Sequence, residues 1–255
     1  MKKKIKILLL GGNSLIGNQL SNFLSQKNVS VFRTFKNIKK DKNKNFKFNP
    51  FKDFEKINYI CKKTNPNFII NTIGITKHRK EINNFEQTMF LNSLFPHKLS
   101  EFCEKKKYRL IHFSTDCVFS GKEGNYNENS IPDSIDLYGV SKALGEIKDN
   151  LNCLTIRTSF IGYEQKYKKG FYEWVLSHEN NSKRITGFKK AIYNGLTTLE
   201  LSKIIYIIIN KKHFFSGLYN VSSKKISKHD LIKIILGIYK IDLKIVENQS
   251  FFCDR

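Results

Sequence analysis

The chain has 255 residues, 40% of them hydrophobic, which suffices for one large core and excludes a disordered or fibrous protein. The 45 Lys and Arg residues outnumber the 22 Asp and Glu residues and give a formal net charge of +23, yet only six of the 45 are Arg. Base and phosphate recognition favours the planar Arg side chain, so we interpret Lys as the general surface residue of this chain and expect no nucleic acid partner.

Cysteine usage and apolar run lengths predict a soluble protein of a reducing compartment. The five cysteines are odd in number and never form a C-x-x-C motif, which indicates reduced thiols and a cytoplasmic location. The apolar run Ile7–Leu10 is too short for a signal peptide. Ile204–Ile209 is far short of the roughly 20 residues that span a bilayer. We therefore expect no membrane association.

The first 157 residues alternate short apolar runs with helical patterns, which is typical of βα units that build a parallel sheet. The predicted strands are Ile5–Leu10, Val29–Arg33, Asn67–Asn71, Arg109–Ser114 and Cys153–Arg157. The predicted helices are Ser14–Gln26, Phe54–Lys63, Phe85–Lys106 and Tyr138–Asn150. The Lys- and Asn-rich stretch Lys36–Lys47 is expected to lie in solvent.

Beyond residue 160 two capping boxes predict two further helices. Thr197-x-x-Glu200 and Ser227-x-x-Asp230 each precede Leu and Ile at helical spacing, and Leu218–Ser222 between them has a strand pattern. The patterns together predict an α/β fold. A doubly wound parallel Rossmann sheet (1–160) would carry a smaller C-terminal α/β lobe (161–255).

A glycine-rich turn, GGNSLIG, lies between the first predicted strand and the first predicted helix. Such a turn lets backbone amides reach a pyrophosphate at a helix N-terminus, so it predicts a dinucleotide site rather than an ordinary βα turn. Ser14 stands where the usual G-x-x-G-x-x-G form has its second glycine. The predicted cofactor-binding residues of the turn are Gly11, Asn13, Ser14, Leu15, Ile16 and Gly17.

The residue at the end of the second strand indicates which cofactor binds. An acidic side chain there would bind the ribose 2′-hydroxyl of NAD, and a cation would accommodate the 2′-phosphate of NADP. The residue is Arg33, with Lys36 close behind. We therefore expect NADP(H), with NAD(H) left open.

Tyr138 and Lys142 share one helix face at i,i+4 spacing. The spacing alone is weak evidence for a functional pair, since Tyr59 and Lys63 have the same spacing by chance. Tyr138, however, follows Ser114-Thr115-Asp116 at the carboxyl end of a buried strand, where parallel sheets place their sites. We expect Tyr138 and Lys142 to be functional.

Taken together, the motifs resemble the extended short-chain dehydrogenase/reductases, and more closely their dTDP-4-dehydrorhamnose reductase (RmlD-like) branch. The resembling segments are LLLGGNSLIG, IINTIG, FLNSLFPHKL, HFSTDCVFSGKEGNYNE, DLYGVSKALGE and RTSFIG, between residues 8 and 162. A weaker likeness continues in GFYEWVLS, RITGF and GLTTLELSK.

The resemblance implies NADPH-dependent reduction of the 4-keto group of a nucleotide-linked 6-deoxy sugar, dTDP-4-dehydro-L-rhamnose above all. It makes Thr115 the catalytic hydroxyl, Tyr138 the proton donor and Lys142 the residue that binds the nicotinamide ribose and lowers the pKa of the tyrosine. A neighbouring ammonium does favour a phenolate. The resemblance further places Asn71, Gly74 and Ser114 beside the cofactor and assigns Asn92 to support of the site.

Contacts to the sugar nucleotide are expected from Thr115, Asp116, Trp174 and Arg184. For Trp174 a place in the core is the alternative, and for Arg184 an ordinary solvated basic face. The six histidines show no metal-ligand spacing, so no metal is expected.

Single residues also bear on other activities of related enzymes. The acidic pair with which 4,6-dehydratases follow their catalytic Thr is replaced by Asp116-Cys117, which disfavours dehydration. A nucleotide-sugar epimerase and a non-catalytic NADP-binding regulatory subunit stay open, as does a homo-oligomer. The chain stops after Phe251-Phe252-Cys253-Asp254-Arg255 where the resembled family continues, so we expect a truncated lobe in which Phe251 and Phe252 lack cover.

Overall fold

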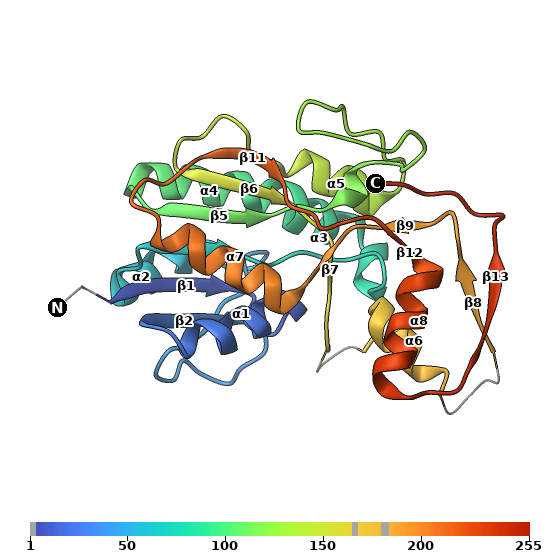
Figure 1. Cartoon of the computed structure of the whole chain (residues 1–255). Coiled ribbons are helices and arrows are strands. Elements are labelled where there is room, and N and C mark those ends of the chain that lie inside the picture. The colour runs from blue at the N-terminus through green and yellow to red at the C-terminus, as the bar shows by residue number, and fades with distance from the viewer. Residues whose placement is uncertain (1–3, 165–167, 180–183) are drawn as a thin grey trace.

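A computed structural model describes residues 4–164, 168–179 and 184–255 and has a seven-stranded parallel sheet at its centre (Figure 1). The strand order is β11-β6-β5-β4-β1-β2-β3, and the strands span Ile5–Leu10 (β1), Val29–Phe35 (β2), Asn45–Lys47 (β3), Phe68–Asn71 (β4), Arg109–Phe113 (β5), Cys153–Arg157 (β6) and Gly217–Asn220 (β11). The chain winds one way from β1 to β3 and the other way from β4 to β11. Ligands of such sheets bind beyond the carboxyl ends of the strands where the order reverses, here at β1 and β4.

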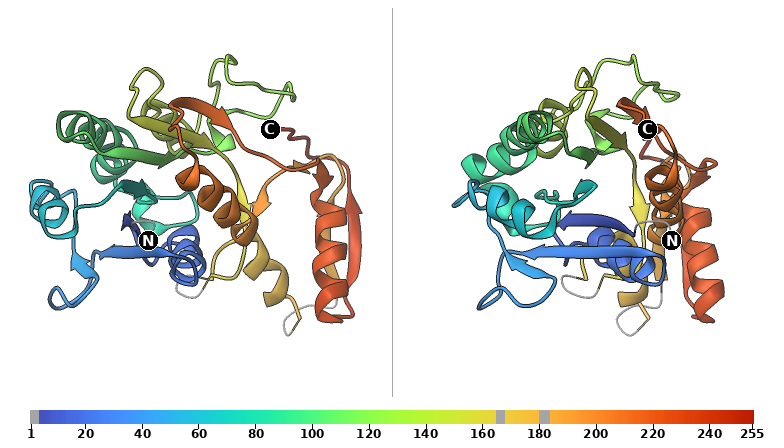
Figure 2. Two further views of the ribbon diagram at one scale, coloured as in Figure 1. Left: turned by 60° about the vertical axis from the view of Figure 1, so that its left-hand side comes forward. Right: turned by 90° about the vertical axis from the view of Figure 1, so that its left-hand side faces the viewer.

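Helices cover both faces of the sheet (Figure 2). On one face α1 (Leu15–Ser25) and α7 (Thr198–Asn210) bury their apolar stripes against β1, β4, β5 and β6. On the other face α2 (Lys56–Thr64) and α4 (Phe95–Lys106) pack in a second cluster with Leu8, Leu10 and Ile69. The alternation of Leu8 and Leu10 with Ile7 and Leu9 supplies both clusters, as expected of a strand buried on two sides. The predicted doubly wound α/β class is confirmed.

The lobe is built from α6 (Phe171–Ser177), α8 (Lys228–Tyr239) and three short strand pairs. β8 (Arg184–Phe188) runs parallel to β13 (Lys244–Asn248), and β9 (Ile192–Tyr193) runs antiparallel to β12 (Ile226–Ser227). β7 (Phe160–Ile161) pairs with β10 (Leu196–Thr197). A small core of its own unites the lobe: Val175, Ile185, Ile232, Ile235 and Leu236.

The predicted division at residue 160 needs correction, because the chain returns to the first domain after it enters the lobe. β11 pairs with β6 at the edge of the main sheet, and Leu201 and Ile205 of α7 pack in one cluster with Leu20 of α1. The apolar stripe of α7 covers the sheet face that α1 alone leaves open. Residues 198–220 therefore belong to the sheet domain.

Three predicted segments differ in detail. Lys36–Lys47 does not lie wholly in solvent, because its end forms the edge strand β3 and Phe46 is buried. The single helix predicted over 85–106 consists of α3 (Phe85–Met89), a π-helical turn η2 (Phe90–Leu94) and α4, preceded by a 3-10 turn η1 (Lys80–Asn83). The helix predicted from Tyr138 to Asn150 is α5 (Leu137–Leu144) and stops at Gly145, where any side chain would collide with the carbonyl oxygen of Asn92.

Both helices predicted from capping boxes begin with the N-cap hydrogen bond of that motif. The Thr197 hydroxyl accepts from the Glu200 amide at 3.1 Å, and the Ser227 hydroxyl accepts from the Asp230 amide at 3.0 Å. These bonds satisfy N–H groups that the first turns of α7 and α8 would otherwise leave unpaired.

The segment 251–255 lies against the sheet domain. Phe251 and Phe252 are about half exposed, whereas Cys253 is buried and its carbonyl accepts from the Ile192 amide at 2.7 Å. The Asp254 amide donates to the Gly121 carbonyl at 2.8 Å. The lobe and the loop after β5 are thus joined through Cys253 and Asp254.

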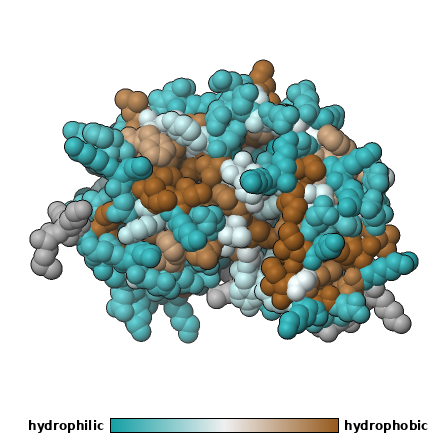
Figure 3. All heavy atoms as spheres, viewed as in Figure 1, coloured by the Kyte–Doolittle hydropathy of each residue, from teal (hydrophilic) through white to brown (hydrophobic). Residues whose placement is uncertain are grey.

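The surface carries both hydrophilic and hydrophobic side chains. Hydrophobic atoms interrupt the hydrophilic surface on the face that Figure 3 shows. Exposed apolar side chains of α7, β11 and α8 include Ile207, Tyr219, Ile234 and Ile238. Within the described ranges, no helix is both long and apolar enough to cross a bilayer.

Candidate functional site

The turn after β1 has the backbone of a phosphate-binding loop. Gly11 has φ +87°, a conformation that favours glycine. A Cβ on Gly17 would lie 2.3 Å from the Gly11 carbonyl oxygen, so helix α1 approaches the turn as closely as backbones can. Ser14 caps the helix, with its hydroxyl accepting from the Gly17 amide at 3.0 Å. Neither Leu15 nor Ile16 caps the helix, and the Ile16 side chain packs in the core, so Ile16 can bind a cofactor only through its backbone.

Thr72, which follows β4, locks the turn in place. Its hydroxyl lies 2.7 Å from the Leu10 carbonyl, 3.1 Å from the Gly11 carbonyl and 2.8 Å from the Ser14 hydroxyl. Thr72 thus joins the carboxyl ends of β1 and β4. The glycine motif contains no hint of this role, because Leu10 and Thr72 are 62 residues apart in the chain and meet only where β1 and β4 lie side by side.

A cavity opens beyond the carboxyl ends of β1 and β4, where the strand order reverses, and it fits an anionic ligand. Among its lining residues are Gly11, Asn13, Ser14, Lys36, Gly74 and Arg79. The glycine backbone, the N-terminus of α1 and two cationic side chains are what the pyrophosphate and ribose phosphate of a dinucleotide require. The residues present therefore fit NAD(P)(H).

Arg33 lies at the edge of this region and is already engaged. Its Nε donates to Asn45 Oδ1 at 3.0 Å, its Nη1 lies 3.4 Å from the Ser21 hydroxyl, and its guanidinium lies over the Phe35 ring. Lys36 lines the cavity, whereas Arg33 is not among the lining residues. The cation nearest to a 2′-phosphate is therefore expected from Lys36, with Arg33 beside Gly12 behind it.

Asn71 and Gly74 shape the turn after β4. Asn71 is buried, with its amide nitrogen 3.1 Å from His112 Nδ1 and its Oδ1 accepting from the Ile73 amide at 3.0 Å. Asn71 therefore stabilises the turn through its hydrogen bond with the Ile73 amide, and Gly74 of the same turn lines the cavity.

Asn92 in the π-helical turn holds two segments together. Its Oδ1 accepts from the Ile75 amide at 2.8 Å, and its Nδ2 donates to the Ile75 carbonyl and to the Ser141 hydroxyl. The turn after β4 and helix α5 are thereby fixed to each other. This placement agrees with the supporting role that the resemblance implies.

Thr115 and Asp116 follow β5 and point their side chains to one another. The Thr115 hydroxyl lies 3.1 Å from Asp116 Oδ1 and also accepts from the Cys117 amide at 3.1 Å. Asp116 Oδ1 accepts a further hydrogen bond from the Ser159 hydroxyl. Asp116 thus links the loop after β5 to the chain that leaves β6 for the lobe.

Tyr138 and Lys142 lie on α5, which Asp136 caps by accepting from the Gly139 amide at 2.8 Å. Burial raises the pKa of the Tyr138 phenol, whereas the resemblance implied a lowered one; a hydrogen bond with the Thr115 side chain acts in the lowering direction. Burial lowers the pKa of Lys142 to about 8, and the charge of Glu146 opposes that effect. The Lys142 ammonium donates to the Phe113 carbonyl at 2.7 Å. The structure therefore brings Thr115, Tyr138 and Lys142 together at the carboxyl end of β5.

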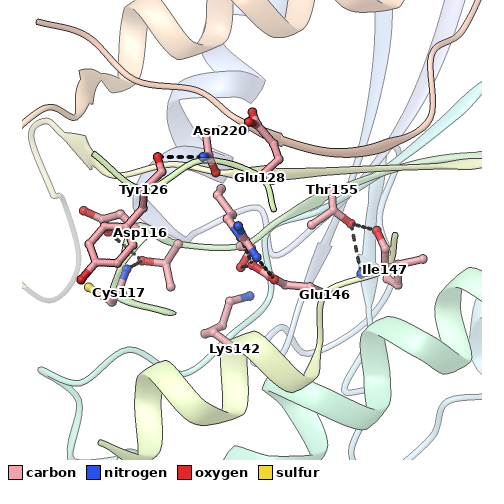
Figure 4. A network of polar contacts seen from close by, with 12 residues as sticks. Asp116, Cys117, Tyr126, Glu128, Lys142, Glu146, Ile147, Thr155 and Asn220 are labelled. Carbon is pink, nitrogen blue, oxygen red and sulfur yellow. Dashed lines mark hydrogen bonds and ion pairs between the residues drawn. The ribbon is translucent and has the colours of Figure 1, made fainter. Parts of the chain in front are cut away.

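A buried ion pair lies next to these residues, and Figure 4 labels its carboxylate, Glu146, together with Lys142. Arg157, at the end of β6, donates twice to Glu146 at 2.7 Å, and both side chains are 1% exposed. The Ser114 hydroxyl donates to Glu146 Oε1 at 2.8 Å, so the Ser114 side chain faces the ion pair. Sequence reasoning missed Glu146 and Arg157. The signal available was the extension of the Tyr138–Lys142 spacing by four residues to Glu146.

The two remaining predicted residues lie in the lobe. Trp174 is 39% exposed on α6, with its ring tilted against Phe171 and edge-on to His178, so it is not a core residue. Arg184 is exposed at the first residue of β8, opposite Lys244 in the outer strand pair. None of the described contacts joins Trp174 or Arg184 to Thr115 or Tyr138.

Within the part of the chain that the structure describes, no three His, Cys, Asp or Glu side chains gather as a metal site would need. The five cysteines are free thiols.

One family model matches nearly the whole chain. The family described as RmlD substrate binding domain matches residues 5–250. A curated relative, the probable low-salt glycan biosynthesis reductase Agl14 of Haloferax volcanii, is 31% identical over 132 residues, which is 49% of this chain and 44% of that protein. The match therefore spans less than half the length of that relative.

Solved structures share the fold over nearly the whole chain. A hypothetical dTDP-4-dehydrorhamnose reductase from Sulfolobus tokodaii is 25% identical with a TM-score of 0.80, covering 97% of this chain and 87% of that one. The dTDP-4-dehydrorhamnose reductase of Bacillus anthracis, solved in complex with NADP, is 20% identical with a TM-score of 0.79, covering 97% and 85%. MoeE5, solved with UDP-glucuronic acid and NAD, is 14% identical with a TM-score of 0.75, covering 98% and 87%.

Proposed function

The chain belongs to the RmlD substrate binding domain family, and we propose that it is an NAD(P)H-dependent reductase of the keto group of a nucleotide-linked sugar. The observation that carries the proposal is the meeting of Thr115, Tyr138 and Lys142 at the carboxyl end of β5, next to a glycine-rich turn that fits a dinucleotide. A phenol, an ammonium and a hydroxyl at one point are the groups that carbonyl reduction needs.

Each residue has a distinct part in the reaction. Bound NAD(P)H supplies the hydride that adds to the carbonyl carbon. Tyr138 gives its phenolic proton to the carbonyl oxygen, and since burial raises its pKa, the phenol is protonated at neutral pH before the reaction. Thr115 donates a hydrogen bond that holds the same oxygen. Lys142 stabilises the negative charge that develops on Tyr138 and binds the nicotinamide ribose.

The finer assignment is the 4-keto group of dTDP-4-dehydro-L-rhamnose, with NADPH as the preferred cofactor. Lys36 in the cavity and Arg33 beside it support NADPH over NADH. The names of the similar solved structures support the sugar. Asp116 and the lobe residues Trp174 and Arg184 are the candidates for contacts with the nucleotide sugar.

The test is the absorbance of NADPH with purified protein and an enzymatically prepared dTDP-4-dehydro-6-deoxy sugar, next to Tyr138→Phe as control. Sugar-dependent oxidation that the variant lacks supports the reductase. Conversion of the sugar without net NADPH consumption would indicate an epimerase instead. NADPH binding without conversion of any sugar would indicate a regulatory subunit.

A further inference from the structure

The carboxylate of Glu146 joins three segments that each end at the candidate site. Glu146 lies two residues beyond α5, its Oε1 accepts from Ser114 at the end of β5, and both oxygens accept from Arg157 at the end of β6. Ser114 immediately precedes Thr115, and Lys142 lies one helical turn before Glu146. One buried group is therefore bonded to the ends of β5 and β6, and Figure 4 labels it near Lys142.

Glu146 cannot contact a substrate itself. Its side chain is 1% exposed, and its two oxygens hold three donated hydrogen bonds. Any effect of Glu146 on the reaction must act through its neighbours.

The nearest functional neighbour is Lys142, whose ammonium is buried. Its one described hydrogen bond goes to the neutral Phe113 carbonyl, which leaves most of its charge without compensation by direct contact. An anion nearby favours the charged form of a buried amine, and the Glu146 charge does act on Lys142 in that direction. The titratable groups near Lys142 are Tyr138 and Glu146 of its own segment, His112 of β5, and Arg157 of β6, which is bonded to Glu146. His97 of α4 contacts the Leu144 carbonyl at the end of α5.

Glu146 is the one carboxylate in that set, and it is held by Arg157 and Ser114. Burial lowers the pKa of His112 far below its usual range, so His112 is neutral and gives no charge to the site. Arg157 is a cation and would repel Lys142 if its own partner were lost. The Arg157 Nη1 atom is buried without a hydrogen-bond partner, so the carboxylate is the main compensation for this guanidinium too.

We propose that Glu146 is a positioning residue, whose buried carboxylate keeps the Lys142 ammonium charged and holds the Ser114-Thr115 segment at the end of β5. The proposal rests on the proposed function for the roles of Lys142 and Thr115. Because Lys142 is expected to bind the nicotinamide ribose, the effect extends to cofactor affinity as well as to turnover.

The backbone around Glu146 has a second attachment, which makes a charge-only substitution informative. Thr155 of β6 donates its hydroxyl to the Ile147 carbonyl at 2.8 Å and accepts from the Ile147 amide at 3.3 Å. These bonds do not involve the Glu146 side chain. Glu146→Gln, which keeps the shape and removes the charge, should therefore leave the segment in place.

The experiment measures NADPH affinity by fluorescence and NADPH-dependent turnover from about pH 6 to about pH 9, in wild type and Glu146→Gln. In Glu146→Gln the alkaline loss of NADPH affinity and of kcat should move to lower pH by about one unit, since the ammonium has lost its anion and gained an unpaired guanidinium. Glu146→Asp keeps the charge and should keep the wild-type midpoint even where kcat falls. Glu104→Gln, which removes an exposed carboxylate of α4, is the control for the loss of one negative charge.

Glu146→Gln leaves Arg157 charged and unpaired and can fail to fold. In that case Glu146→Gln/Arg157→Met removes both charges, and a smaller displacement in the same direction is expected. An unchanged midpoint for NADPH binding in the folded variants would overturn the proposal and assign Glu146 to stability alone. The binding measurement needs no sugar, so it decides the role of Glu146 even if the reductase assay fails.

Discussion

Gly17→Ala tests whether the first turn of α1 has the geometry of a dinucleotide site. A Cβ at this position would lie 2.3 Å from the Gly11 carbonyl oxygen, 2.7 Å from Ser14 Oγ and 2.9 Å from Thr72 Oγ1. The Gly11 carbonyl already accepts from the Ser14 amide at 3.0 Å and from the Thr72 hydroxyl at 3.1 Å. The methyl group can therefore fit only if the turn moves away from the helix and stretches these bonds.

Two opposing effects set the size of the change. Alanine gains about 1 kcal/mol over glycine inside a helix, whereas forcing a methyl group into a closed contact costs about 1–3 kcal/mol, with the upper end expected against rigid backbone. We expect a net loss of about 1–2 kcal/mol in the free energy of unfolding and at least a tenfold weaker NADPH affinity, because the displaced amides no longer meet the pyrophosphate.

Gly237→Ala is the matched control, since Gly237 lies in α8 and a Cβ at this position would meet no neighbouring atom within 4 Å. The same substitution should stabilise the protein there by about 0.5–1 kcal/mol and leave NADPH binding unchanged. Urea denaturation and NADPH fluorescence titration measure both variants. A Gly17→Ala protein as stable and as tightly bound to NADPH as wild type would refute the reasoning.

Four further outcomes are expected. Tyr138→Phe should lower kcat by about 10²–10⁴ and keep NADPH binding, whereas lost binding in a titration would place Tyr138 in a different role. Lys36→Ala should weaken NADPH about tenfold and NADH much less, and equal losses for the two cofactors in parallel titrations would contradict a 2′-phosphate contact. Arg157→Met leaves its buried carboxylate partner unpaired and should cost about 3–5 kcal/mol in urea denaturation, so a loss below about 1 kcal/mol would show that the ion pair contributes little. A hydrogen bond from Ser227 lowers the pKa of Asp230 to about 2. The stability that the Asp230 carboxylate contributes is therefore complete above the ordinary Asp pKa and is lost as the pH falls from about 4 to about 2. Asp230→Asn should make the free energy of unfolding less dependent on pH over that range, and an unchanged dependence would argue against this role.

Local chemistry made much of the fold predictable. The apolar runs of β1, β4, β5 and β6 could be recognised because strands of a parallel sheet are buried on both faces. The N-caps at Thr197 and Ser227 formed as predicted because the capping hydrogen bond joins residues only three apart.

The sequence by itself determined the site residues whose spacing is local: the glycine turn at 11–17 and the Tyr138–Lys142 pair on one helix face. The tertiary structure alone decided which distant residues meet them. Thr72 reaches Ser14 across two strands, and Arg157 meets Glu146 and Ser114 where three segments end. The return of α7 and β11 to the sheet was equally hidden, because an apolar stripe or strand pattern does not say which surface it will cover. Pairing between remote segments depends on the burial of whole faces, and that is a property of the assembled sheet.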